Sequence, residues 1–283
     1  VWVKLLMATF GMGLSAMAIV MAVFVSGLAL GSFVIAYVGQ RWQAPPVMRF
    51  GCLQAAVGIW AVFLPYLVHM LDSAYTAWAP PVESWAHTLV RLVAVAAAIL
   101  VPSCLIGAVF PVLSEFSPQL SRERAQGPGR LFLMGLLCSA AGAVIAPTWL
   151  LPRLGIAASS GAIGLVNLVL AAAAFGLGRV LVVPAGGSAS DVELEMVEAP
   201  RTHLSGVAFV QGFALFGLEL IGAKVLWLSV DTTAYAEGIL FGVVLLAMAV
   251  GSFLALVLRR VQVPAISLLF YSLLLAALTE SLM

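Results

Sequence analysis

The chain has 283 residues, of which 63% are hydrophobic and only 9% are charged, and its formal net charge is +1. Because an ordinary soluble domain is about a quarter charged, this composition excludes a soluble globular protein. Runs of about twenty apolar residues recur along the chain, and each is long enough to cross a hydrocarbon core of roughly 30 Å as an α-helix. Strands of a membrane β-barrel would instead alternate polar and apolar residues. The sequence therefore predicts an all-α, polytopic transmembrane helical bundle.

Nine membrane segments are predicted in chain order, the first being the tail of a helix. Between the third and fourth segments, the stretch 71–87 contains a Pro80-Pro81 pair that breaks helices, and its Trp78 and Trp85 suit the headgroup layer. We expect an interfacial loop there, or a short helix lying flat on the membrane. The nine segments are 1–10, 13–38, 47–70, 88–113, 131–151, 156–178, 204–228, 235–258 and 264–282.

The arginines predict the orientation of the bundle. When successive segments alternate in direction, nine arginines fall on one side of the membrane, and only Arg91 and Arg153 fall on the other. Because short cytoplasmic loops carry an excess of Lys and Arg, we expect the arginine-rich side to face the cytoplasm. The nine are Arg41, Arg49, Arg122, Arg124, Arg130, Arg179, Arg201, Arg259 and Arg260.

A polar stretch divides the chain into two parts. Residues 180–203 are rich in Pro, Gly, Ser and acidic residues, which is typical of a flexible linker, and they fall on the cytoplasmic side. We expect a first bundle of six segments over 1–179 and the start of a second bundle, with three segments, over 204–283. Since the chain opens without Met and stops in or just after an apolar run, we expect both bundles to be truncated.

One short motif occurs twice. The hexapeptide LALGSF at 28–33 is echoed by MAVGSF at 248–253, and aligning 1–33 with 221–253 gives nine identities. A random pairing of this composition would give roughly three or four, so the match indicates an internal repeat. Six segments separate the copies, which therefore run in the same direction. Parallel six-helix repeats are the plan of major-facilitator-type transporters.

Glycines near these motifs predict close helix contacts. Gly27 and Gly31 are four residues apart, as are Gly238 and Gly242, and this spacing lets two helix backbones approach each other in a membrane. We interpret these four glycines, together with Gly251, as packing positions. A role in a gate is the alternative.

Four stretches also carry a family pattern. In SGVAFVQGFALFGLELIGAKVLWL at 205–228, the positions that matter are Ser205, Gly206, Glu219 and Lys224. Together the stretches resemble the membrane region of bacterial spermidine-synthase-like proteins, in which a major-facilitator-like, apolar multi-helix region is fused to a soluble aminopropyltransferase domain. The resemblance covers nearly the whole chain and implies a link to polyamines. The other matching stretches are FVSGLALGSF at 24–33, GAVFP at 107–111, and LLPRLG at 150–155 with Asn167.

The chain also departs from that family. Gly222 stands where the family often has Trp, Val109 where it usually has a threonine, and GLLC at 135–138 where it usually has an Asn-Thr-x-Gly run. Polar groups of the fifth helix have thus become apolar. The sequence contains no segment suited to an aminopropyltransferase domain, and no paired acids or Ser/His couple for an intramembrane enzyme. We therefore predict that the chain is not an enzyme.

Three charged residues are candidates for an intramembrane role, because an ionised side chain at the bilayer centre costs about 2.5–3.5 kcal/mol on insertion scales. Lys4 and Lys224 lie near helix ends, where their side chains can snorkel to the headgroups. Glu219 lies deeper, and we hypothesise that it pairs with Lys4 across the pseudo-twofold axis. A protonated Glu219 bonded to a backbone carbonyl is the alternative.

Two further acids, Asp231 and Glu237, lie at the periplasmic mouth of the next helix. We interpret them as solvated, with a role in receiving a cation as the alternative. The three cysteines lie singly inside apolar segments and are interpreted as small buried hydrophobic side chains. The three histidines are scattered as well, so no metal site and no cofactor are predicted.

Two functions remain in view. The first is a non-catalytic membrane module that acts as an anchor or as an accessory or scaffold subunit of a larger membrane complex. The second is a transporter of a small cation such as a polyamine. Transport would require several carboxylates near the midplane, and the sequence offers one, Glu219. The partners that we expect are the lipid bilayer and other membrane subunits, with a small cation in the transport alternative and no nucleic acid.

Overall fold

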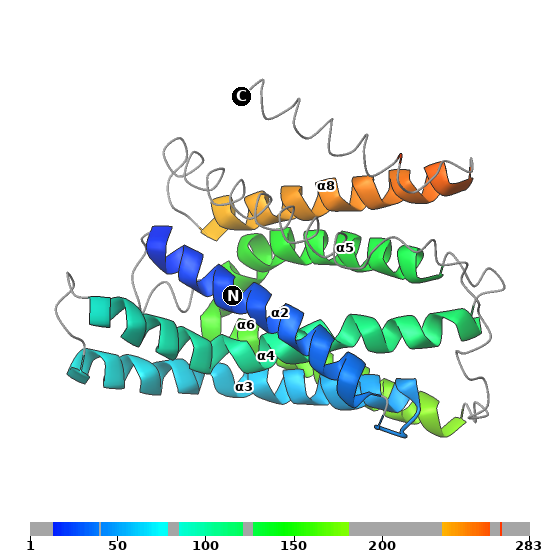
Figure 1. Ribbon diagram of the computed structural model, residues 1–283. Coiled ribbons are helices and arrows are strands. Elements are labelled where there is room, and N and C mark those ends of the chain that lie inside the picture. Colours follow the sequence, from blue (N-terminus) through cyan, green and yellow to red (C-terminus); the bar gives the residue numbers. More distant parts are fainter. Residues whose placement is uncertain are drawn as a thin grey trace.

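A computed structural model describes residues 14–39, 41–78, 85–120, 127–180, 234–260 and 267. Among these residues the regular structure is entirely helical, which confirms the predicted all-α class (Figure 1). One π-helical turn, η1, continues the helix α5. The elements are α2 (Leu14–Val38), α3 (Pro46–Trp78), α4 (Trp85–Leu120), α5 (Gly127–Ile145), η1 (Ala146–Leu150), α6 (Leu151–Val180) and α8 (Ala234–Arg260).

In the described part of the chain, five helical stretches are long and apolar enough to cross a membrane. This length and composition are the features of an integral membrane protein. Six of the predicted segments fall on these helices. The predicted segments 1–10 and 204–228 lie outside the described residues, as does 264–282 apart from residue 267. The stretches are Ala18–Val38, Pro46–Ala74, Leu92–Glu115, Gly129–Arg179 and Gly238–Leu258.

The longest of these stretches contains two helices rather than one. Pro147 lacks the N–H that an α-helix would use, and the chain there forms the π-helical turn η1. Gly155 has a φ of 71°, a left-handed conformation that glycine adopts without steric penalty. The chain reverses at this point, and α6 then runs back along the molecule (Figure 1).

Helices extend into both ends of the predicted interfacial loop. Helix α3 continues to Trp78 and α4 already begins at Trp85, so the prediction of a loop over 71–87 was wrong at both of its ends. A proline interrupts a helix at its own position and disfavours helical geometry in the residue before it. The residues from Leu71 to Trp78 include no proline or glycine, and the helix therefore extends through them.

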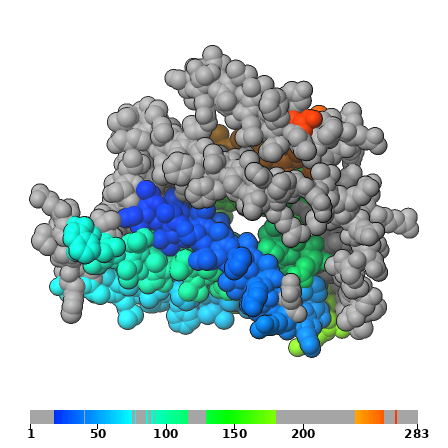
Figure 2. Space-filling model, viewed as in Figure 1, coloured from blue at the N-terminus to red at the C-terminus, as the bar shows by residue number. Residues whose placement is uncertain are grey.

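Four helices, α2, α3, α4 and α6, pack together through the contacts described below and are called here the four-helix group (Figure 1). Their contacts give their directions: α2 runs parallel to α4, and α3 runs antiparallel to both α4 and α6. Figure 2 shows α2 lying across the surface of this group. Its apolar core includes Val20, Leu64, Val68, Val95 and Ile99, all nearly inaccessible.

Helices α5 and α8 pack along each other as a separate pair, called here the α5–α8 pair (Figure 1). They are antiparallel, because Gly129 at the start of α5 faces Leu256 near the end of α8, whereas Gly238 faces Pro147. Phe132 of α5 meets Phe110 of α4 edge to face, with ring centroids 5.5 Å apart. The α5–α8 pair therefore touches the four-helix group through α4.

These directions bring the arginine-bearing helix ends together. The ends of α2, α4, α6 and α8 and the starts of α3 and α5 lie at the same end of the bundle (Figure 1). Arg91 and Arg153 lie toward the opposite end, where the guanidinium of Arg153 stacks 4.5 Å above the Trp149 ring. The end of α6 and the start of α8 are at opposite ends of the bundle.

Candidate functional site

Most of the charged residues singled out from the sequence lie outside the described residues. This holds for Lys4, Glu219, Lys224 and Asp231. Glu237 belongs to the first turn of α8, and its side chain is also outside the described part. The proposed pairing of Glu219 with Lys4 therefore stays a prediction.

The first pair of predicted packing glycines lies against α4. A Cβ on Gly27 would fall on the Cβ of Ser103, and a Cβ on Gly31 would fall on the backbone of Cys104. Gly107 of α4 is equally close to Leu28. The α2 and α4 backbones are thus in direct contact, which a larger side chain at any of these glycines would prevent.

The three predicted packing glycines of α8 differ in how closely they approach another helix. A Cβ on Gly238 would lie 2.6 Å from the carbonyl oxygen of Ala143, and a Cβ on Gly242 would lie 2.7 Å from Val144 Cγ2, both in α5. A Cβ on Gly251 would meet no described atom within 4 Å. Gly251 is thus the only one of the five predicted packing glycines that faces open space in the described structure.

A third close contact, between α3 and α6, was not predicted. A Cβ on Gly58 would lie 2.8 Å from the carbonyl oxygen of Gly164, and a Cβ on Gly164 would lie 2.9 Å from that of Gly58. Gly51, one heptad before Gly58, packs on Phe175 in the same interface. Residues seven apart share a helix face, so a search at that spacing as well as at four residues would have indicated this contact.

Three hydrogen bonds between helices share one feature, which is that each accepting carbonyl lies four residues before a proline. A proline inside a helix leaves that carbonyl without its usual N–H donor. The indole of Trp60 in α3 donates to the carbonyl oxygen of Ala98 (3.1 Å), freed by Pro102 in α4. An unpaired carbonyl at membrane depth would be costly, so Trp60 replaces a lost bond with one that joins two helices.

Two serines make the same replacement. Ser160 in α6 donates to the carbonyl oxygen of Ala61 (2.6 Å), four residues before Pro65 in α3. Ser32 in α2 donates to the carbonyl oxygen of Gly107 (2.8 Å), four residues before Pro111 in α4, and also to that of Leu28 within its own helix. Together with Trp60, these donors link all four helices of the four-helix group.

An ion pair joins α3 and α4 at the arginine-rich end of the four-helix group. The guanidinium of Arg49, at the start of α3, donates to both carboxylate oxygens of Glu115 in α4. Arg49 is buried, with 8% of its side chain exposed, whereas Glu115 is 45% exposed. The pairing was not predicted from the sequence, because a separation of 66 residues reveals no contact before the helices are placed.

Two buried polar atoms in the described structure have no hydrogen-bond partner, Nε of Arg49 and Oγ of Ser103. Ser103 lies on α4 beside Gly27, in the tight contact with α2. The other polar groups discussed above are used in bonds between helices or within them. The described interior therefore has very few polar atoms available to bind a substrate.

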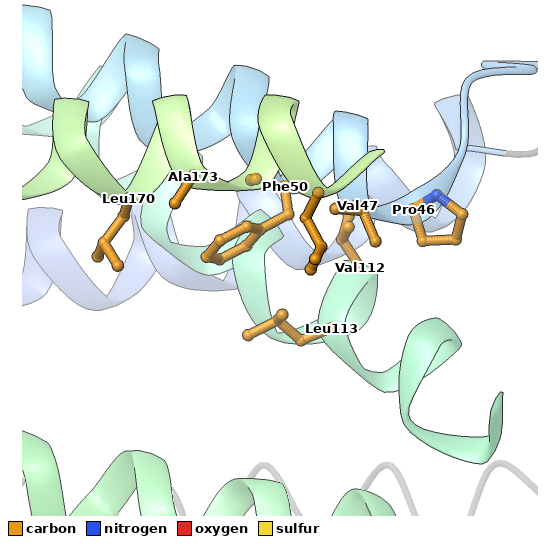
Figure 3. Close-up of a pocket in the computed structure, with 9 residues that line it drawn as sticks. Pro46, Val47, Phe50, Val112, Leu113, Leu170 and Ala173 are labelled. Atoms are coloured by element: carbon orange, nitrogen blue, oxygen red, sulfur yellow. The ribbon is translucent and has the colours of Figure 1, made fainter. Parts of the chain in front are cut away.

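A groove of about 340 Å³ lies between α3, α4 and α6 toward the arginine-rich end. Figure 3 shows its apolar side chains arranged around the space. Phe50, Val112 and Leu170 contribute from three different helices. Such a cavity has no group to bind an ion, and apolar cavities do not hold ordered water. The full lining is Pro46, Val47, Phe50, Val112, Leu113, Leu170, Ala173, Ala174 and Leu177.

The cysteines do not all follow the prediction of burial. Cys104 is partly buried, but Cys52 and Cys138 are exposed, so that prediction was wrong for two of the three. Small apolar side chains on the outer face of a transmembrane helix meet lipid, and burial within the protein is not needed to keep them from water. Among the described residues no group of three His, Cys, Asp or Glu side chains comes close enough to hold a metal ion.

The fold and these contacts define a class, an integral membrane protein of helices joined by backbone contacts and hydrogen bonds to carbonyls freed by proline. No protein-family model, no curated protein and no solved structure matches the chain. The assignment of function therefore depends on the residues and their geometry.

Proposed function

We propose that this chain is a non-catalytic integral membrane module that acts as an anchor or as an accessory or scaffold subunit of a larger membrane complex. The observation that supports this proposal is that the interior polar side chains form hydrogen bonds between helices. Trp60, Ser32 and Ser160 each donate to a backbone carbonyl of a neighbouring helix. All nine side chains that line the groove of the four-helix group are apolar. The described interior is built to hold helices together rather than to bind or convert a polar substrate.

The outer surface supports the same proposal. Helix α8 presents large apolar side chains over most of its length, including Val243, Leu246, Phe253 and Leu254. Only 11% of its membrane-spanning window is buried inside the molecule, compared with 44% for α4. Such a helix leaves most of its surface to lipid or to neighbouring subunits.

The finer architecture is part of the proposal. We place nine membrane segments in two bundles, 1–179 and 204–283, joined by a flexible cytoplasmic linker over 180–203 and related by the repeat of 1–33 at 221–253. The arginine-rich end faces the cytoplasm of a bacterial inner membrane. The resemblance to the membrane region of spermidine-synthase-like proteins makes a polyamine enzyme or another membrane protein a natural partner.

Gentle purification from native membranes, followed by mass measurement of the intact particle, tests this proposal. Another polypeptide at fixed stoichiometry is the expected result. A protein that purifies alone and whose melting temperature rises with spermidine would instead indicate the transporter of small cations, because a ligand that binds the folded state stabilises it. The matched control is the same thermal melt without spermidine, in NaCl of equal ionic strength.

A further inference from the structure

Two rows of exposed side chains share the same order and spacing. In the first, Phe33 and Tyr37 lie on α2, and Arg41 lies in the turn that follows this helix. Phe33 and Tyr37 are 73% and 63% exposed, and Arg41 is exposed as well. Because residues four apart are neighbours on a helix surface, these side chains form a continuous row, called here the α2 row.

The second row lies where α5 passes through η1 into α6. Ile145 is the last residue of α5, Trp149 belongs to η1, and Arg153 is the third residue of α6. Ile145 and Trp149 are 54% and 52% exposed, and Arg153 is exposed. This elbow row repeats the order of the α2 row, with an apolar, an aromatic and a cationic side chain at intervals of four residues.

Each arginine is held against the ring of its row. The guanidinium carbon of Arg153 lies 4.5 Å from the centre of the Trp149 ring, and that of Arg41 lies 5.5 Å from the centre of the Tyr37 ring. A cation–π contact of this kind does not use the N–H donors of the guanidinium. Those donors form a planar fork that matches two oxygens of a phosphate. The ring therefore positions a group suited to bind phosphate.

The two rows lie at opposite boundaries of the membrane-spanning stretches. The stretch of α2 ends at Val38, so Tyr37 lies at its limit and Arg41 lies just beyond it. Trp149 follows Gly129, where another stretch begins, by 20 residues. That is about 30 Å along a helix, the thickness of the hydrocarbon core. Each row thus runs outward from apolar to aromatic to cationic.

We propose that each row binds a phospholipid, one row in each leaflet of the bilayer. The arginine binds the lipid phosphate, and the ring lies at the level of the headgroups, where Trp and Tyr are enriched. Phe33 or Ile145 contacts an acyl chain. Lipids with a net negative charge are favoured, because each arginine adds an attraction to an anionic surface. This inference goes beyond the proposed role as a subunit and does not depend on it.

Other occupants match only part of each row. A carboxylate would suit the guanidinium, and so would a soluble phosphate, but neither would contact the aromatic and apolar side chains beside it. A phospholipid carries its acyl chain, ester groups and phosphate in the same order as the row. It is also the component that both leaflets supply, which fits two equivalent rows at the two boundaries of the spanning stretches.

Photolabelling with a defined lipid tests the assignment. The purified full chain is placed in vesicles of phosphatidylcholine with a minor fraction of phosphatidylglycerol that carries a diazirine in its headgroup. After irradiation, mass spectrometry should find adducts in the peptides that contain 33–41 and 145–153. Arg153→Gln should reduce the adducts at 145–153 about fivefold, the usual contribution of one cation at an anionic membrane surface. It should leave those at 33–41 unchanged, and Arg41→Gln should do the reverse.

Further variants separate the parts of the elbow row. Trp149→Leu should reduce the adducts at 145–153 about threefold, because Arg153 loses its cation–π contact. Arg153→Lys should reduce them about twofold, since it keeps the charge and loses the planar fork. Arg179→Gln, at an exposed arginine in the last turn of α6 outside both rows, should leave both sets of adducts unchanged. All these positions are exposed, so the variants should fold.

Three results would overturn the assignment. One is labelling at 145–153 that Arg153→Gln leaves unchanged. Another is labelling there that increases in Asp231→Asn or Glu237→Gln, because an acid of this chain would then already neutralise Arg153. The third is competition by glycerol 1-phosphate that equals competition by unlabelled phosphatidylglycerol, which would indicate a site for soluble phosphates. The expected result is competition by the lipid alone.

Discussion

Helices α2, α3 and α4 of the four-helix group and helix α8 of the α5–α8 pair are all apolar, yet they differ in how much of each helix is covered. The membrane-spanning windows of α2, α3 and α4 are 33%, 39% and 44% buried, whereas that of α8 is 11% buried. In water, an exposed apolar helix such as α8 would be destabilised. In lipid, an apolar helix face is already in an apolar medium, so covering it with another helix brings no hydrophobic gain. Both regions contain close helix contacts at glycines. The hydrogen bonds to carbonyls freed by proline lie in the four-helix group, and apolar composition does not reveal them.

The largest effect should come from glycine in the two copies of the motif. Gly31→Ala places a methyl group on the Cys104 backbone and should lower the free energy of unfolding by about 3 kcal/mol. Gly251→Ala, which meets open space, should change it by less than about 0.5 kcal/mol. Reversible unfolding in mixed detergent and SDS micelles measures both. Equal losses of unfolding free energy for Gly31→Ala and Gly251→Ala would contradict the predicted difference between the two glycines.

The ion pair of the four-helix group should give the next largest effect. Glu115→Gln leaves the buried Arg49 guanidinium without its counter-charge and should cost about 2 kcal/mol, less than a fully buried pair because Glu115 is half exposed. Arg49→Met should cost less, since the remaining carboxylate still reaches water. The same micelle unfolding measures both, and a larger loss for Arg49→Met than for Glu115→Gln would reverse this account of the pair.

The replacement of a lost backbone bond by Trp60 can be tested with a double-mutant cycle. Trp60→Phe should cost about 1 kcal/mol beyond its lost packing, because the Ala98 carbonyl loses its donor. Pro102→Ala restores an N–H to that carbonyl, so in this background the hydrogen-bond part of the loss should vanish. The coupling free energy from the four proteins measures the bond. A coupling near zero would mean that the indole only fills space.

The smallest effect compares the two serines. Ser32→Ala should cost about 0.6 kcal/mol, the average for a hydrogen bond between membrane helices, because the Gly107 carbonyl loses its donor. Ser252→Ala should change the stability of the purified chain less, since Ser252 lies on α8, whose membrane-spanning window is only 11% buried. Thermal unfolding of both variants side by side gives the difference. A similar loss for Ser252→Ala would show that its face is already occupied within the chain.

Helix identity was the part of the fold that the sequence predicted well. The predicted segments 13–38, 131–151 and 235–258 agree with the observed helices to within a few residues, because a span of about twenty apolar residues is required by the thickness of the bilayer. The parts of α3 and α4 that extend past the predicted segments were missed, since helix continuation there does not follow hydrophobicity, and α4 even continues through Pro118. The predicted intramembrane charges lie outside the described residues.

The interior contacts could be predicted only in part. The spacing of Gly27 and Gly31 pointed to a close helix contact, but not to α4 as the partner. The prolines at 65, 102 and 111 are visible in the sequence, and each marks a carbonyl that needs a donor. Which side chain supplies the donor depends on the helix that lies alongside, and no local pattern links Trp60 to Ala98.

The sequence by itself determined that this is an all-helical membrane protein and where most of its described spans lie. These properties follow from composition and length, which act locally along each helix. The tertiary structure alone decided that Gly31 of one Gly-Ser-Phe motif lies against α4 while Gly251 of the other meets no described atom, and that Arg49 contacts Glu115. In a membrane every apolar face is tolerated by lipid, so the choice of neighbour depends on shape and on single hydrogen bonds, and these exist only once the helices are side by side.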